Sequence, residues 1–257
     1  MLTITPISAL QTNYIWAITS LFSANKVVIV DPGEAAPVLN YLEQYQLKLS
    51  AILITHHHPD HTAGITEILS YYPCPVYAGI EETKVNATHR IKDSEKFTIE
   101  ALNLTFTALH LPGHTQGHIA FYGHNVVFTG DTLFAAGCGR NFEGSCAQLY
   151  QSLQKLLTLP PETQIYCGHE YTEQNLRFGM IVEPNNADIQ HKLNLVQVLR
   201  AENKCTLPSS FAEEINTNVF LRCHLPEIKI AAETHADHPL DDDAAVFTTL
   251  RDWKNNF

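Results

Sequence analysis

Short runs rich in isoleucine, valine, threonine and aromatic residues dominate the first two thirds of the chain. Runs of this kind, when glycine, proline or asparagine bounds them, favour β-strands. Between several of them, apolar residues recur at the three- and four-residue spacing of an amphipathic helix. We expect strands over residues 2–7, 14–19, 26–30, 51–54, 75–78, 104–109, 119–122, 126–128 and 164–167, and helices over residues 34–44, 62–70 and 145–157.

The pattern changes after residue 170, because strand-like runs become rare and helical spacing takes over. Helices are expected over residues 172–180, 189–203 and 244–253, and residues 206–210 form a linker or a helix start. The chain is therefore predicted to be of the α/β (α+β) class. A domain of mixed sheets occupies residues 1–170, and a smaller, mainly helical domain occupies residues 171–257.

Composition narrows the choice of function. The chain has 257 residues, of which 45% are hydrophobic and 17% are charged, so a packed core is expected rather than disorder. With 27 acidic and 16 basic residues, the net charge of −11 argues against nucleic acid as a partner. The sequence shows no secretory signal and no apolar stretch long enough to span a bilayer. Its six cysteines are scattered, so we expect reduced thiols. Together these observations predict a cytoplasmic protein with no membrane partner.

The strongest chemical signal is the segment His56-x-His58-x-Asp60-His61, which directly follows a predicted strand. In an extended segment, residues two apart point to the same side, so His56 and His58 can face one ion. Asp60 and His61, at the following turn, can reach a second ion. Imidazole and carboxylate groups are suitable ligands for zinc, iron and manganese.

Three later turns supply what a two-metal site would still lack. His114 lies in Pro-Gly-His-Thr-x-Gly-His, Asp131 in Thr-Gly-Asp and His169 in Cys-Gly-His, and each turn follows a strand-like run. Asp131 has two oxygens and is the natural bridge between two cations. Two ions that share a water lower its pKa toward neutrality, so no serine or cysteine nucleophile is required. The carboxylates of Asp60 and Asp131 are therefore the groups expected to serve catalysis.

The series T-H-x-H-x-D-H, P-G-H-T-x-G-H, G-D-T and G-H-E-Y resembles the metallo-β-lactamase fold superfamily. The resemblance implies an αββα sandwich, here with a small C-terminal helical domain, and two divalent metal ions, with Zn²⁺ expected and Fe or Mn as alternatives. It also implies a ligand assignment for this chain. One metal is bound by His56, His58 and His114, the second by Asp60, His61 and His169, and Asp131 is shared.

The second half resembles a narrower group, the hydroxyacylglutathione hydrolase (glyoxalase II) family, through residues 133–144, the Gly-His-Glu-Tyr turn and the tail Leu-Arg-Asp-Trp-Lys. This resemblance implies an enzyme that hydrolyses S-(2-hydroxyacyl)glutathione, and we expect it to be a monomer. The typical substrate is S-D-lactoylglutathione, and the products are D-lactate and glutathione, as in methylglyoxal degradation. A thiolate of pKa about 8.5 leaves readily, so no strong general acid is needed.

The two carboxylates of glutathione would be repelled by an acidic protein unless cations lay nearby. Family position makes Arg140, Arg251 and Lys254 those cations, although basic residues near a helix C-terminus are also favoured by the helix dipole. Tyr171 is expected to donate a hydrogen bond to the tripeptide. Phe142 stands where some family members have a glutathione-binding tyrosine, and it lacks the hydroxyl.

Two other functions stay open at this point. A mononuclear iron dioxygenase of the same fold, acting on glutathione persulfide, would need only the histidines and one carboxylate. A protein that binds metal or glutathione without turnover would keep the same ligands. The roles of Asp31, Thr115 and His118 are also open, since each can orient a metal ligand or serve structure alone.

Overall fold

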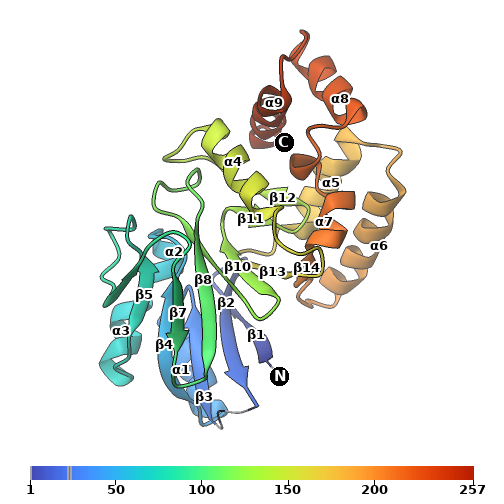
Figure 1. Ribbon diagram of the computed structural model, residues 1–257. Helices are drawn as coiled ribbons and strands as arrows, with labels where there is room; N and C mark the ends of the chain where they lie inside the picture. Colours follow the sequence, from blue (N-terminus) through green and yellow to red (C-terminus); the bar gives the residue numbers. More distant parts are fainter. Residues whose placement is uncertain (1, 22, 24) are drawn as a thin grey trace.

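In the computed structural model, which describes residues 2–21, 23 and 25–257, two six-stranded sheets pack face to face (Figure 1). The first sheet is antiparallel from β1 to β3 and parallel from β3 to β6. Its strands are, in spatial order, β1 (Leu2–Ala9), β2 (Asn13–Ser20), β3 (Lys26–Val30), β4 (Lys48–Ile54), β5 (Val76–Gly79) and β6 (His89–Ile91).

The second sheet is antiparallel except where β10 and β13 run parallel. A small two-stranded sheet, β11 (Leu133–Phe134) and β12 (Gly137–Cys138), lies beside it. The strands of the second sheet are, in spatial order, β14 (Ser209–Ser210), β13 (Gln164–Cys167), β10 (Val126–Gly130), β9 (Ile119–Gly123), β8 (Leu104–His110) and β7 (Lys96–Ile99).

Three apolar layers hold the sandwich together. The layer between the sheets contains Trp16 and Val28 of the first sheet and Phe106 and Phe128 of the second, all buried. The outer face of the first sheet is covered by α1 (Ala35–Gln44) and α3 (Ile65–Tyr71), and the outer face of the second by α4 (Cys146–Leu156), while the short helix α2 (Pro59–Thr62) follows β4. This helix–sheet–sheet–helix order confirms the predicted αββα sandwich.

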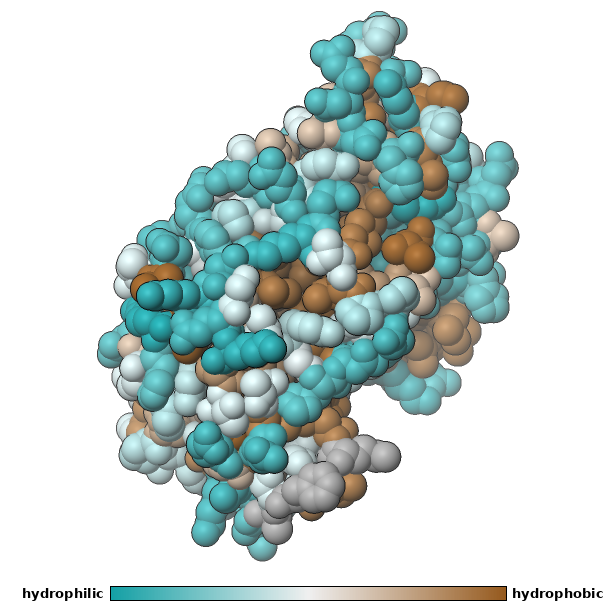
Figure 2. All heavy atoms as spheres, viewed as in Figure 1, coloured by the Kyte–Doolittle hydropathy of each residue, from teal (hydrophilic) through white to brown (hydrophobic). Residues whose placement is uncertain are grey.

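The chain after β13 is mainly helical, as predicted, and it packs on the second sheet. Its apolar residues form one continuous cluster with Leu109, Val127 and Ile165 of that sheet. Figure 2 shows hydrophilic side chains over most of the face drawn in Figure 1, with hydrophobic ones near its centre. The elements are α5 (Thr172–Val182), α6 (Ala187–Ala201), α7 (Phe211–Thr217), the 3-10 helix η1 (Val219–Leu221), α8 (Pro226–Ala236) and α9 (Asp243–Asn255).

Buried polar side chains of α7 and of its C-cap residue Asn218 connect this helical part to the sandwich. The carboxylate of Glu214 accepts a hydrogen bond from the Ala136 amide (2.7 Å), and the Asn218 side chain donates to the Gly137 carbonyl (3.0 Å). Lys192 of α6 donates to the same glutamate at 2.9 Å. Since Glu214 is fully buried, these bonds satisfy a carboxylate that would otherwise be costly to bury.

Every strand and helix expected from the sequence is present, with ends shifted by a few residues, but several elements were not predicted. Residues 206–210, expected as a linker or helix start, end in the edge strand β14 and the N-cap Ser210 of α7. Helix α8 buries only Ile228 and Ala232, so its sequence carries little helical periodicity. Among the described residues, no helix is long and apolar enough to cross a membrane.

Candidate dinuclear metal site

The predicted metal ligands meet at one edge of the sandwich, on turns that follow strands. The histidine-rich segment leaves β4, Asp131 follows β10, and His169 follows the neighbouring parallel strand β13. Two glycines make this crowding possible. A Cβ on Gly130, which has a φ of 48°, would lie 2.3 Å from Thr55 Oγ1, and one on Gly168 would lie 2.5 Å from Asp131 Oδ1. Only glycine fits at either position.

Three histidines form the first ligand group. The Nδ1 atom of His58 lies 3.2 Å from Nε2 of His56 and 3.0 Å from Nε2 of His114. Tetrahedral zinc with bonds of 2.0–2.1 Å would place its nitrogen ligands about 3.3–3.4 Å apart. Burial lowers the pKa of all three imidazoles, which keeps them in the neutral form that binds metal. The geometry and the protonation state therefore both fit a divalent ion.

A second group contains one carboxylate and two histidines. Asp60 Oδ2 lies 3.5 Å from Nε2 of His61 and 3.3 Å from Nε2 of His169. Burial opposes the charged imidazolium of His61, yet the carboxylate of Asp131 raises the pKa of that imidazole well above its usual range. A cation bound among these carboxylates would replace the imidazolium proton as the balancing charge.

Asp131 lies between the two groups, as predicted for a bridge. Its Oδ1 is 3.3 Å from His61 Nε2, and its Oδ2 is 3.2 Å from His169 Nε2 and 3.6 Å from His114 Nε2. Within the described part of the chain, His61 Nε2 and Asp131 Oδ1 are buried without a hydrogen-bond partner. Buried polar atoms are rarely left unpaired, so these two are best explained as ligands of a metal ion.

The other ring nitrogen of four ligand histidines is anchored. Such a bond fixes which nitrogen faces the metal and how the ring is turned. Asp31, whose role the sequence left open, orients His61 and also accepts from the Thr55 amide at 2.8 Å. The anchors are Thr55 Oγ1 for His56 (3.1 Å), Asp31 Oδ2 for His61 (3.1 Å), the Arg140 carbonyl for His114 (2.8 Å) and Thr12 Oγ1 for His169 (3.0 Å).

Two residues at this site were missed by sequence reasoning. Besides Thr12, the side chain of Asn13 donates to Oδ2 (3.0 Å) and to the carbonyl oxygen (3.2 Å) of Asp60. In the sequence, Thr12 and Asn13 are recognisable only as two adjacent polar residues at the start of a strand. His118 accepts a hydrogen bond from the Asp131 amide at 3.2 Å, so it supports a ligand. Thr115 instead donates to Glu82 at 2.7 Å.

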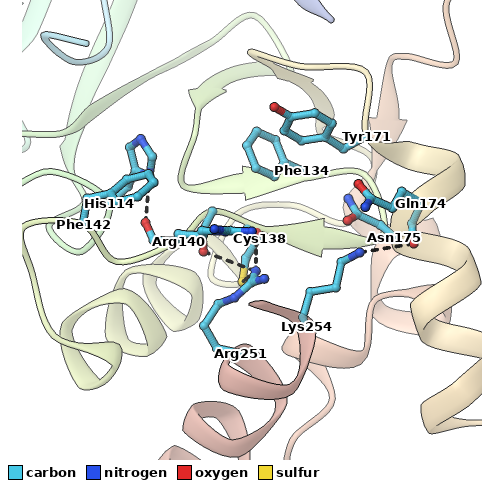
Figure 3. A pocket seen from close by; sticks show the side chains of 11 residues that line it. His114, Phe134, Cys138, Arg140, Phe142, Tyr171, Gln174, Asn175, Arg251 and Lys254 are labelled. Carbon is cyan, nitrogen blue, oxygen red and sulfur yellow. Dashed lines mark hydrogen bonds between the residues drawn. The ribbon is translucent and has the colours of Figure 1, made fainter. Parts of the chain in front are cut away.

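A cavity of about 340 Å³ opens beside the first ligand group, and Figure 3 shows the side chains that line it. The structure brings all the predicted substrate residues into this cavity, where they meet the ligand His114. Phe134, Cys138, Gln174 and Asn175 also line it and were not predicted. The predicted residues are Arg140, Phe142, Tyr171, Arg251 and Lys254.

The cavity is strongly positive, since three of its lining residues are cations and none is a carboxylate. Arg251 is 4% exposed and donates to the Cys138 carbonyl at 2.7 Å, while its Nε atom has no partner among the described residues. Lys254 is 9% exposed; burial, with Arg251 and Arg140 nearby, lowers the pKa of its ammonium to about 8. A ligand with more than one negative charge would fit this cavity.

Two aromatic rings connect the cavity to the predicted metal ligands. The ring of Tyr171 stacks on His169, with centroids 4.8 Å apart and planes within 2° of parallel. Phe142 is 65% exposed, and its ring stands edge-on to His58 and His114 at centroid distances of 5.8 and 5.3 Å. A ligand in the cavity would therefore extend past Phe142 toward the first ligand group.

Comparison with known proteins agrees with this geometry. Residues 10–169 match the family model of the metallo-β-lactamase superfamily, and residues 170–257 match that of the hydroxyacylglutathione hydrolase C-terminus. The solved structures of ETHE1 from Myxococcus xanthus (22% identity, TM-score 0.68, 98% of this chain and 91% of that one) and of the BLEG-1 B3 metallo-β-lactamase (24%, TM-score 0.64, 86% and 99%) share the fold. The chain is a member of the metallo-β-lactamase superfamily.

Curated relatives narrow the assignment. Proteins named hydroxyacylglutathione hydrolase from Nitrosomonas eutropha (46% identity, all of both chains) and Aeromonas hydrophila (46%, 98% of each) match over essentially the full length. Within the superfamily, the chain belongs to the hydroxyacylglutathione hydrolase family, which confirms the family predicted from its motifs.

Proposed function

We propose that the protein hydrolyses glutathione thioesters of 2-hydroxy acids, with S-D-lactoylglutathione as the typical substrate. The observation that carries this proposal is the cavity with three cations and no carboxylate, which is lined by the candidate ligand His114. The relatives named hydroxyacylglutathione hydrolase support the same substrate. Residues 1–170 would form the catalytic domain and residues 171–257 the substrate-binding domain of a monomer.

The ligand groups are suited to two divalent ions. Zn²⁺ is the first candidate, and Fe or Mn also accept imidazole and carboxylate ligands. Bound there, such ions would supply a nucleophilic water at neutral pH and polarise the thioester carbonyl. Asp60 and Asp131 would hold and charge-balance the pair, and Asn13 would fix the Asp60 carboxylate through its hydrogen bond.

The remaining steps belong to the chain's own side chains. Arg140, Arg251 and Lys254 would pair with the two glutathione carboxylates and so place the thioester at the metal ligands. Tyr171, whose ring stacks on His169, would donate its hydroxyl to the tripeptide. The glutathione thiolate departs without a proton donor because a thiol of pKa about 8.5 is a good leaving group.

The decisive assay follows the loss of thioester absorbance when purified protein meets S-D-lactoylglutathione. A chelator should abolish the activity and added Zn²⁺ should restore it. No turnover by protein that carries two metals per chain would refute the proposed substrate. One iron per chain, with oxygen consumed on glutathione persulfide, would identify a dioxygenase instead, but that reaction leaves the group of Asp60, His61 and His169 without a role.

A further inference from the structure

Glu143 lies on the loop of residues 139–144 between β12 and α4, directly after Phe142 and three residues after Arg140. Its carboxylate contacts three other segments of the chain. Oε1 lies 2.7 Å from Lys84 Nζ and 3.2 Å from His57 Nε2, and Oε2 accepts a hydrogen bond from the Gln116 amide at 3.0 Å. One side chain therefore joins the substrate loop to both turns that carry the first ligand group.

One partner of Glu143 lies within the histidine-rich segment that carries the candidate metal ligands. His57 stands between the ligands His56 and His58, and its other ring nitrogen lies 2.8 Å from the buried carboxylate of Glu82. The two ring nitrogens of His57 therefore contact the carboxylates of Glu82 and Glu143. Thr115 completes the network by donating to Glu82. Lys84 Nζ lies 3.0 Å from His57 Nε2 as well as 2.7 Å from Glu143 Oε1, so charged and polar groups connect the substrate loop to the turn of the candidate metal ligands.

Backbone hydrogen bonds on both sides of Phe142 also connect the substrate loop to the turn that carries His114. The Glu143 amide donates to the His114 carbonyl at 3.2 Å, the Gly144 amide donates to the Gly113 carbonyl at 3.0 Å, and the Arg140 carbonyl anchors His114 Nδ1. The Gln116 side chain donates to the Glu143 carbonyl at 3.0 Å. The phenyl ring between these bonds is largely exposed and contacts His58 and His114 only edge-on, so packing holds it weakly. Its direction depends on the backbone that carries it.

We propose that Glu143 is a positioning residue for substrate: its carboxylate holds loop 139–144 so that Arg140 and Phe142 face the cavity beside His58 and His114. The kinetic part of this proposal rests on the proposed thioester hydrolysis, whereas the loop geometry does not. Glu143 is ionised at neutral pH, since the hydrogen bond from Lys84 lowers the pKa of its carboxyl to about 2.

The contacts of Glu143 are expected to contribute unequally to substrate binding. The Lys84 side chain is 63% exposed, and exposed ion pairs contribute little, so Lys84→Met should raise KM by about twofold or less. Glu143→Ala removes all three contacts, including the bond to the Gln116 amide, and should raise KM about five- to tenfold. Glu143→Gln keeps an acceptor for that amide and should fall between the two. In every variant kcat should change less than about twofold, because no metal ligand is touched.

The test combines kinetics with two readouts that do not need turnover. Hydrogen exchange of the peptide covering residues 139–146, in metal-loaded and in chelated protein, reports whether the Glu143 and Gly144 amides lose protection. Calorimetry with S-methylglutathione, a thioether that cannot be hydrolysed, gives a dissociation constant. Lys155→Met is the matched control: it breaks an ion pair of the same 2.7 Å length, to Asp93, away from the cavity.

Faster exchange in Glu143→Ala, a matching rise in KM and in the dissociation constant, and unchanged metal content would support the proposal, with Lys155→Met like the wild type. Unchanged exchange with unchanged KM would overturn it. A fall in kcat with loss of metal would also overturn it, since Glu143 would then serve the metal site. If the wild type neither turns over nor binds the glutathione probes, the proposed function fails, and the exchange data still decide whether Glu143 holds the loop.

Discussion

Lys254 is the cation of the cavity whose charge changes nearest to neutral pH. Burial, followed by the charges of Arg251 and Arg140, lowers the pKa of its ammonium to about 8. Its Nζ atom donates to the Gln174 carbonyl and lies 4.6 Å from the centre of the Phe257 ring, so little water reaches it. With that pKa, the ammonium is protonated in about ten of eleven molecules at pH 7 and in about one of eleven at pH 9.

The protonation of Lys254 should appear in the pH dependence of kcat/KM, which reports groups of the free enzyme. Only the ammonium form pairs with a substrate carboxylate, so this contribution to binding falls up to about tenfold between pH 7 and pH 9. The variant Lys254→Arg isolates the effect, because arginine keeps its charge over this range. Titrations of the metal site are common to both proteins and cancel in the ratio of their kcat/KM values.

The expected result is a wild-type to Lys254→Arg ratio that falls by up to about tenfold from pH 7 to pH 9. A flat ratio would refute the reasoning. Stability should respond with the opposite sign, because the unfolded chain holds this proton more tightly, with a pKa near the ordinary 10.5. The free energy of unfolding that this group contributes therefore rises as pH increases above about 8, and urea unfolding of wild type and variant would show it.

Three further predictions follow from other parts of the site and core. Asp131→Asn should lower metal content and abolish most turnover, and full metal with wild-type activity would disprove the bridging role. Phe142→Tyr adds a hydroxyl beside the cavity and should lower KM about two- to tenfold if the hydroxyl bonds glutathione, as the gain from one hydrogen bond allows; an unchanged KM would place the tripeptide elsewhere. Leu250→Ala, at a fully buried position of α9, should lower the free energy of unfolding measured in urea by about 2–5 kcal/mol. A smaller loss would mean that neighbouring side chains move in to fill the space left by the leucine.

The candidate metal ligands could be identified from the sequence because their chemistry is local. Four of the seven lie within residues 56–61, and the other three stand on glycine turns after strand-like runs. Thr12 and Asn13 could not be found in this way. They act through contacts with His169 and Asp60, which are far away in the chain, and neither residue is unusual in its own neighbourhood.

The fold shows the same division between local and long-range information. Strands with β-branched runs and strongly amphipathic helices were predicted, because neighbouring residues determine both. Strand β14 has two residues, both serine, and exists only because β13 offers it a partner. Glu143 and Lys84 are ordinary surface residues in the sequence, and their pairing across 59 positions appears only in the structure.

Glu214 and Asn218 bond to the backbone of Ala136 and Gly137, and a single apolar cluster runs from the second sheet into α9. The helical part is therefore not a detachable module. Exchanging it for the tail of another superfamily member would leave the Ala136 amide and the Gly137 carbonyl without these partners and would uncover the edge of the second sheet where β14 pairs with β13. New substrate specificity is therefore easier to engineer, or to evolve, by changing side chains on α9 and on loop 139–144 than by recombining whole domains.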